Sequence, residues 1–412
     1  VAIREDKVTE LASVMPKVPV ISKKSRPAKP FKQDGSWSIV GSNWFSLLLE
    51  NNLEDDYDGV VEVVTGEKEP NPGSSPQLKA WLNSFGWVPE TFEYKRNKDT
   101  GDVRKIPQMN LKYGGGVCPS IKKLFDVEPK LQVLEGLSIL THRISILNGF
   151  LGNIDEDGYI QARVQGLTNT LRFKHQVVVN LPGVDKPYGT DIRGCLIAPE
   201  GYELLGSDMA ALEDRTKQHY MVPYDPDYVK AMLEPGYCPH VDIGVLARFL
   251  TKEQQQRYSE DKFLSKADEK EIKAGRKKAK PVNYGGVYGQ GAKGLAQETG
   301  MPLAQAEKLI TIYWERNWSV KAIAAAQVVK VSGGMKWLYN PVSGFWYSLR
   351  HEKDRFSTLN QGTGVYCFDM WVKKVKSKGL PIIGQMHDEI IGLVKKGVRE
   401  RATSVCKWAV GE

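Results

Sequence analysis

The chain has 412 residues, 41% of them hydrophobic, which is enough to bury a large core and to form two or three lobes. Its 57 Lys and Arg residues outnumber its 49 Asp and Glu residues, so the net charge is +8 and a polyanionic partner is favoured. The five cysteines are scattered and lack CxxC spacing, which argues against a zinc site and for reduced thiols. The sequence has no apolar run of about 18 residues and no signal-peptide pattern, so we expect a cytoplasmic protein.

The N-terminal third combines a cationic segment with helical patterns. Residues 17–35 are basic and interrupted by proline, so we expect a loop or extended arm, either a solvated linker or a DNA-contacting strap. The stretch EPNPGSSPQ at 69–77 predicts a boundary, after which an amphipathic helix begins. Leucine and isoleucine at helical spacing predict a further helix over 129–151, a pattern that a plain core helix would share.

The remaining two thirds alternate between strand and helix patterns. Residues 153–208 predict short strands with turns, and residues 209–330 predict helices. Strands return near 335–350, followed by a helix from about 355 to 378. A hairpin follows over 380–394.

One predicted helix carries cations and aromatic rings on a single face. Within residues 276–289, the residues Arg276, Lys280, Tyr284 and Tyr288 follow one another at four-residue steps. The cations suit a polyphosphate whose charge grows during transfer, and the rings form a flat apolar floor for a base and sugar. A solvated basic helix with a buried aromatic end would have the same spacing.

Acidic residues occur at the ends of two apolar runs. Asp208 ends one run, and Asp388 and Glu389 lie between the two strands of the predicted hairpin, on a rigid tight turn. Carboxylates adjacent on one sheet would hold two Mg²⁺ ions roughly 3.5 to 4 Å apart, as in-line phosphoryl displacement requires. Turn carboxylates are also often merely solvated, but the apolar strands on both sides leave little other reason for the polar residues here.

Three segments resemble the A, B and C motifs of family A DNA polymerases, the DNA polymerase I family, in the same order. These are residues 204–215, 276–289 and 385–389. The resemblance also takes in NLPG at 180–183, the stretch from PYG at 187–189 to Asp208, CPHVDIG around His240 and Gln-Gly-Thr at 361–363, and it covers roughly residues 75–400. GWVP at 86–89, PYG and Tyr284 look closest to the phage replicative branch, for which the compartment would be the host cytoplasm.

The resemblance implies an α+β fold shaped like a right hand, with an antiparallel-sheet palm, helical fingers and a helical thumb. The implied order is an N-terminal arm or linker with the start of the thumb (1–74), thumb (75–152), first part of the palm (153–215), fingers (216–334) and second part of the palm (335–412).

The implied activity is template-directed addition of deoxynucleotides to a primer 3′ end by two-metal phosphoryl transfer. Asp208, the carbonyl of Met209 and Asp388 would hold two Mg²⁺ ions, for which Mn²⁺ would substitute, and Glu389 would be an accessory acid beside the primer end. The implied partners are primer-template DNA, dNTPs and a replisome or processivity partner.

The same resemblance implies further contacts. Glu213 would lie under the incoming sugar and obstruct a 2′-hydroxyl, and Tyr284 would stack on the nucleotide. The triphosphate contacts would be His240, Arg276 and Lys280, with Tyr288 near the template base. The DNA contacts would be Arg172, Arg193, Gln361 and His387. The alternative for His240 is a capped loop histidine, and the alternative for Arg193 is a surface pair with Asp191 or Glu200.

The chain departs from the family pattern at several positions. Thr168, Asn169 and Thr170 replace the usual Thr-Gly-Arg, and Arg172 follows two residues later, which puts the minor-groove contact to the primer in doubt. Pro281 lies inside the predicted basic helix, where a proline ordinarily causes a kink. Asp214 adds a charge where an apolar residue is usual.

Two other functions compete with DNA synthesis. A single-subunit RNA polymerase shares the two-metal palm, but that family has methionine at the position of Tyr284 and lacks a glutamate matching Glu213. A catalytically silent DNA-binding subunit on the same scaffold would need basic charge but not Asp208 and Asp388 facing a polyanion.

Overall fold

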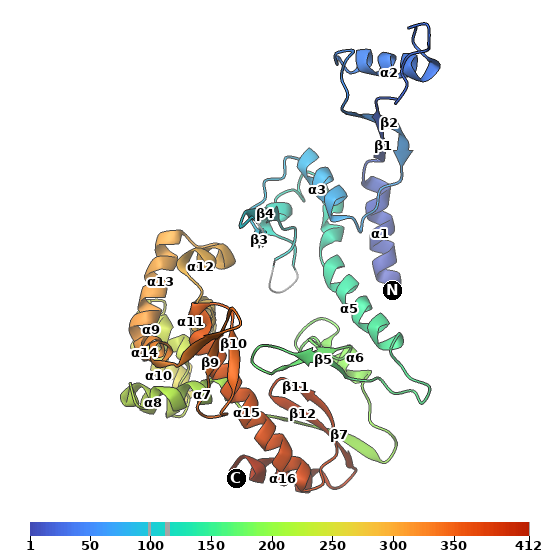
Figure 1. Cartoon of the computed structure of the whole chain (residues 1–412). Helices are drawn as coiled ribbons and strands as arrows, with labels where there is room; N and C mark the ends of the chain where they lie inside the picture. The colour runs from blue at the N-terminus through green and yellow to red at the C-terminus, as the bar shows by residue number, and fades with distance from the viewer. Residues whose placement is uncertain (98–99, 112–115, 412) are drawn as a thin grey trace. The chain divides into compact units, whose positions relative to one another are not determined.

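The computed structural model describes residues 1–97, 100–111 and 116–411, and the chain divides into two compact units, Val1–Ser145 and Ile146–Glu412 (Figure 1). The division falls inside the helix of residues 137–151. The assignment of thumb, palm and fingers, with their expected bounds, stays a prediction. No helix among the described residues has both the length and the apolar character to cross a membrane.

Unit 1 consists of helices around an apolar core and, among its described residues, two antiparallel two-stranded ribbons. Its elements in order are α1 (Ala2–Val14), β1 (Val18–Ser25), α2 (Ile39–Glu50), β2 (Val60–Lys68), α3 (Ser75–Ser84), β3 (Phe92–Arg96), β4 (Val103–Pro107), α4 (Pro119–Lys122), η1 (Pro129–Leu134) and the first part of α5 (Leu137–Leu151). Leu11 of α1, Leu82 of α3 and Leu131 of η1 are fully buried in this core. The helix expected after residue 77 is confirmed as α3.

The structure refines two expectations for unit 1. Residues 17–35, expected as a loop or extended arm, contain the extended strand β1, which pairs antiparallel with β2 from Val18 opposite Lys68 to Ser25 opposite Val60. This pairing joins segments that are distant in sequence, so local composition did not indicate it. The helix expected over 129–151 is interrupted, because Gly136 adopts a φ of +76°, a left-handed conformation, between η1 and α5.

The central sheet of unit 2 has three antiparallel strands in the order β11-β12-β7. They are β7 (Tyr202–Asp208), β11 (Ile382–Met386) and β12 (Glu389–Lys395). Alternate residues of β12, Ile390 and Val394 among them, are buried against Phe368 and Trp371 of α15 (Arg355–Ser377) and against α16 (Arg399–Gly411). Glu389 therefore begins β12 on the sheet face opposite Ile390.

The helical part of unit 2 lies between β7 and α15 in the sequence. It contains α7 (Leu212–Met221), α8 (Pro226–Leu233), α9 (Pro239–Leu246), α10 (Lys252–Glu260), α11 (Lys266–Val287), α12 (Ala292–Thr299), α13 (Leu303–Arg316) and α14 (Trp318–Ala326). A second three-stranded sheet follows, made of β8 (Val329–Ser332), β9 (Met335–Tyr339) and β10 (Trp346–Leu349), then η2 (Glu352–Asp354). Residues 153–201 form β5 (Arg163–Leu167), β6 (Phe173–Gln176) and a short helix that was not expected, α6 (Gly189–Gly194).

The basic helix is longer at its start and shorter at its end than expected. Helix α11 begins after Ser265, whose hydroxyl accepts the Asp268 amide, and it continues through Pro281. It ends at Val287, so Tyr288 is the C-terminal cap with φ −89° rather than part of the helix. The four-residue steps therefore join Arg276, Lys280 and Tyr284 on one helical face, with Tyr288 just beyond it.

Candidate functional site

The acidic residues meet at one end of the central sheet. The pairing of β12 with β7 places Glu389 directly opposite Asp208, and the Asp388 carbonyl accepts a hydrogen bond from the Met209 amide at 3.0 Å. The hairpin turns through His387, whose φ is +55°, because Met386 pairs with Glu389 across the turn. The structure thus brings together the acids of two segments that the sequence separates widely.

The carboxylates at this end of the sheet repel one another. Asp208 is largely exposed, yet the desolvation that it does undergo, and next the charge of Asp388, raise its pKa. Burial, followed by the charge of Asp208, raises the pKa of Glu389, whereas Arg193 acts in the opposite direction. A cation bound beside Asp208 and Glu389 would be favourable, because it offsets the negative charge that raises the pKa of both carboxyls.

The donor set suits Mg²⁺ bound together with a substrate rather than a closed protein cage. Among the described residues, no group of three or more His, Cys, Asp or Glu side chains is arranged to hold a metal ion. Mg²⁺ in phosphoryl-transfer sites commonly takes one or two carboxylates and completes its octahedral shell with water and substrate phosphates. Asp208 and Asp388, with the neighbouring Met209 carbonyl, fit that pattern. Asp208 and Met209 also line a cavity of about 820 Å³ bounded by α7, α15 and α16.

Four predicted residues form one continuous chain of polar contacts. Arg172, in the loop between β5 and β6, pairs with the Glu213 carboxylate at 3.1 Å, and the Tyr288 hydroxyl donates to the same carboxylate at 2.9 Å. The Gln361 amide of α15 in turn donates to the Tyr288 hydroxyl at 3.2 Å. Arg172, which was expected to contact DNA, therefore forms an ion pair with Glu213 in this structure.

The start of α7 is held in place by Asn360 of α15, a residue that the sequence did not indicate as part of the site. The Asn360 amide donates to the Glu213 carbonyl at 2.9 Å and accepts from the Thr216 hydroxyl at 2.9 Å. Both Asn360 and Thr216 are buried. Buried, mutually satisfied polar groups of this kind hold a backbone segment in one position.

A cavity of about 650 Å³ adjoins the cationic face of α11. His240, Arg276 and Tyr284 line it, together with residues of the loops around α10. The rings of His240 and Tyr284 lie 5.4 Å apart, and Arg276 donates through Nε to the sulfur of Cys238 at 3.3 Å. Cys238, one of the five scattered cysteines, therefore orients a predicted phosphate contact.

Burial decides the charge of His240. Its burial, followed by the charges of Arg276 and Lys280, lowers its pKa to about 4, so it is neutral at neutral pH. Its Nδ1 atom is buried and has no hydrogen-bond partner within the part of the chain that is described. His240 is thus buried at the start of α9 beside two cations, rather than serving as a capped loop residue.

The remaining predicted residues are exposed or only partly engaged. Lys280 is exposed, with Nζ 5.5 Å from the centre of the Tyr284 ring, and Tyr284 is itself 55% exposed. Arg193 donates to the Pro182 carbonyl at 2.7 Å instead of forming the alternative pair with Asp191 or Glu200. The His387 ring lies 5.8 Å from that of His175. Exposed groups beside the acids and the cavity remain free to meet a ligand.

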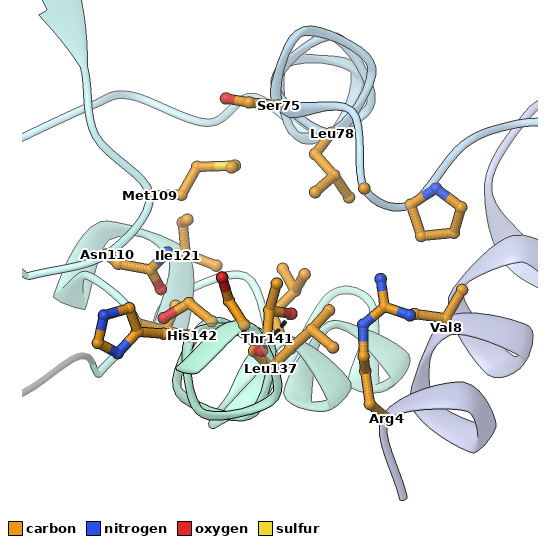
Figure 2. Close-up of a pocket in the computed structure, with 16 residues that line it drawn as sticks. Arg4, Val8, Ser75, Leu78, Met109, Asn110, Ile121, Leu137, Thr141 and His142 are labelled. Carbon is orange, nitrogen blue, oxygen red and sulfur yellow. Dashed lines mark hydrogen bonds between the residues drawn. The ribbon is translucent and has the colours of Figure 1, made fainter. Parts of the chain in front are cut away.

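Unit 1 contains a separate cavity of about 450 Å³ (Figure 2). Its lining is mainly apolar, with Leu78 of α3, Ile121 of α4 and Leu137 of α5 facing it, whereas Arg4 and His142 lie at its edge. None of the predicted site residues lies there, so this cavity does not compete with the acidic end of the sheet as the site.

Comparisons with known proteins find similarity to proteins named DNA polymerase I. No protein-family model matches the chain. The thermostable DNA polymerase I of Thermus filiformis is 26% identical over 242 residues, which are 55% of this chain and 27% of that protein. The Thermus aquaticus enzyme is 25% identical over 244 residues, with 56% and 27% covered. DNA polymerase I of Helicobacter pylori strain J99 is 32% identical over 143 residues, with 34% and 13% covered. The chain thus spans about a quarter or less of the length of these relatives.

A solved polymerase structure has a fold similar to that of this chain. The POL domain of Pol1 from M. smegmatis, in complex with DNA primer-template and dNTP, matches 84% of this chain and 58% of that chain with a TM-score of 0.60 and 20% identity. The expected α+β fold with small antiparallel sheets is therefore confirmed as that of a polymerase domain. The relatives support the resemblance to the DNA polymerase I family but not the narrower resemblance to its phage branch.

Proposed function

We propose that the chain catalyses template-directed DNA synthesis, adding deoxynucleotides to the 3′ end of a primer. The observation that carries the proposal is the acidic end of the sheet, where Asp208, Asp388 and Glu389 meet. The cationic helix face and its adjoining cavity belong to the same compact unit. Paired carboxylates together with phosphate-binding cations suit phosphoryl transfer.

Asp208, the Met209 carbonyl and Asp388 would hold two Mg²⁺ ions, and Mn²⁺ would substitute for them. Bound there, the ions would lower the pKa of the primer 3′-hydroxyl and stabilise the charge of the leaving pyrophosphate. Glu389 lies across the sheet from Asp208 and would stand beside the primer end. The raised pKa of Asp208 and of Glu389 supports this assignment, because a divalent cation would relieve the repulsion.

The face of α11 would bind the incoming nucleotide. Arg276 and Lys280 would neutralise the triphosphate, and Tyr284 would stack on the base and sugar. His240 is neutral, so it would contribute a hydrogen bond rather than a charge. Its Nδ1 has no hydrogen-bond partner among the described residues, which supports a role in ligand binding, because a buried polar atom without a partner is costly.

Glu213 would select the sugar. Arg172 and Tyr288 both hold its carboxylate, so the side chain has a defined position from which to obstruct a ribose 2′-hydroxyl. Tyr288 would lie near the template base, supported by Gln361. This arrangement favours DNA over RNA synthesis, since the competing RNA polymerase family lacks a glutamate at this position.

Primer-template DNA would bind along the same unit. Arg193, Arg172, Gln361 and His387 would contact it near the primer terminus, and the excess of 57 basic over 49 acidic residues supports a DNA partner. A role in phage replication in a host cytoplasm, with a replisome or processivity partner, rests only on the likeness of GWVP, PYG and Tyr284 to the phage branch.

Primer extension with dNTPs or rNTPs, each with and without Mg²⁺, tests the proposal. We expect Mg²⁺-dependent extension with dNTPs only. Extension mainly with rNTPs would indicate an RNA polymerase, and DNA binding without extension in either case would indicate a silent DNA-binding subunit.

A further inference from the structure

Helix α7 carries a lysine that is buried and that the proposed chemistry does not use. Lys217 is 5% exposed, and its ammonium donates to the side-chain oxygen of Asn317 at 2.7 Å. Asn317, which is completely buried, lies between the end of α13 and the start of α14. Burial, opposed by the charge of Asp214, lowers the pKa of Lys217 to about 8.

Burying the ammonium of Lys217 lowers the stability of the fold, because no opposite charge pairs with it closely among the described residues. No carboxylate lies within ion-pair distance of it among the described residues, and its printed partner is a neutral amide. Asp214 of α7 and Asp242 of α9 favour its charge, whereas Arg316 of α13 opposes it. An apolar side chain of similar size would fill the same space without the desolvation cost.

Asn317 belongs to the junction between α13 and α14, here residues Tyr313, Arg316 and Asn317, which contacts α7, α9 and α11. Besides Asn317, which meets α7, Arg316 pairs with Asp242 of α9 at 2.9 Å. Tyr313 lies against α11 at Gly286, where an added Cβ would come within 2.3 Å of the tyrosine ring. The Asn317 amide also donates to the Tyr313 carbonyl at 3.0 Å, which ties the three contacts together.

The helices that meet at this junction carry the residues assigned to the nucleotide. Glu213 lies one turn before Lys217 on α7, His240 lies two residues before Asp242 on α9, and Arg276 lies on α11. Because residues four apart share a helix face, a shift of Lys217 relative to Asn317 moves Glu213 in the same direction.

We propose that Lys217 is a positioning residue for sugar selection, which holds Glu213 of α7 in register with the phosphate-binding helices α9 and α11 through Asn317. The inference deepens the proposed function and rests on it. Lys217 itself does not touch the nucleotide. Its loss would displace Glu213 without removing any group that contacts substrate.

Replacing the ammonium while keeping its length and bulk provides the test. Lys217→Met removes the charge and the donor, Lys217→Gln keeps a donor for Asn317, and Lys7→Met is a matched control. The Lys7 ammonium of α1 donates to the backbone carbonyls of Val133 and Glu135, each at 3.2 Å, so these hydrogen bonds involve none of α7, α9, α11 and α13. For each variant, the efficiencies with dNTP and rNTP, the separate kcat and KM for dNTP, and the Tm are measured.

We expect Lys217→Met to reduce the preference for dNTP over rNTP about fivefold to tenfold and to raise KM for dNTP more than it lowers kcat. Lys217→Gln should restore part of the preference, and Lys7→Met should lower Tm with the preference unchanged. A lower Tm of Lys217→Met with unchanged preference and KM would overturn the inference, because the role would then be structural only.

Two further arms keep the outcomes separable. If Lys217→Met does not fold, Lys217→Gln and Asn317→Ser decide the question by the same ratio, and unchanged ratios in both overturn the inference. If the parent chain extends no primer while it is folded and binds DNA, the proposed function fails instead.

Discussion

Glu389, the first residue of β12, is the direct cross-strand partner of Asp208, the last residue of β7. An added Cβ on Gly206 would come within 2.9 Å of the Glu389 carboxylate, so that side chain leans over the glycine of the facing strand. The glycine thus provides the space that a second carboxylate needs beside Asp208. The mutual proximity of these acids is the basis of the first prediction.

Asp388→Asn should abolish primer extension while leaving primer-template affinity nearly unchanged. The change removes a charge next to Asp208, whereas DNA affinity rests mainly on cationic contacts to phosphates. The expected loss is of the order of 3 kcal/mol or more in activation free energy, over a hundredfold in rate. Asp185→Asn, at an exposed position, is the control for loss of one negative charge. A turnover within about tenfold of the parent would refute the metal assignment.

Lys280→Ala should raise KM for dNTP by roughly tenfold or more and leave duplex affinity almost unchanged. Lys280 is exposed beside Tyr284, on the helix face that adjoins the cavity lined by Arg276. Steady-state kinetics and DNA titrations at several salt concentrations separate the two effects. Weaker duplex binding with a reduced salt slope and normal nucleotide kinetics would instead make this face a DNA-tracking surface.

Glu213→Ala should improve use of rNTP relative to dNTP, because it removes the carboxylate that is expected to obstruct the 2′-hydroxyl. Arg172→Ala should have the same direction with a smaller effect, since it frees Glu213 from one of its two partners but leaves Tyr288. Competing rNTP and dNTP incorporation measures both ratios. If Arg172→Ala weakens primer binding and leaves the ratio unchanged, Arg172 acts on DNA rather than through Glu213.

Tyr284→Phe should make the enzyme reject dideoxynucleotides, with normal dNTPs little affected. The resemblance implies that a tyrosine here accepts chain terminators, because its hydroxyl replaces an interaction lost with the 3′-oxygen. Losing one hydrogen-bond partner in a closed site discriminates by several kcal/mol, so the change should be large. Equal ratios of ddNTP to dNTP incorporation for the two proteins would show that Tyr284 lies outside the nucleotide site.

His240 should make folding stability depend on pH between about 4 and 6.5. The unfolded chain binds the imidazole proton below the ordinary pKa of 6.5, whereas the folded chain binds it only below about 4. Stability therefore falls as the pH falls through this window, by of the order of 3 kcal/mol.

His240→Asn should remove that component of the pH dependence. Urea unfolding at a series of pH values measures the free energy of unfolding, and His351→Asn, at an exposed position, serves as the matched control. An identical slope in His240→Asn and the parent would contradict the burial of a neutral His240.

Local pattern alone was sufficient for much of the site. The apolar runs around Asp388 predicted the β11-β12 hairpin, and the four-residue spacing predicted the shared face of Arg276, Lys280 and Tyr284, because strand and helix periodicity are properties of short segments. The end of the helix was less predictable: Tyr288 lies past α11, where Gly289 has a φ of +67°.

Other relationships were decided only by the tertiary structure. The register that sets Glu389 opposite Asp208, the pairing of β1 with β2 and the contact of Arg172 with Glu213 all join distant segments, and no local period encodes their alignment. Lys217 shows the limit most clearly: its sequence context resembles that of a solvated lysine, and only the packing of α7 against Asn317 excludes water from it. Side-chain type and spacing thus determined which groups the chain offers, whereas burial and long-range pairing determined which of them face one another.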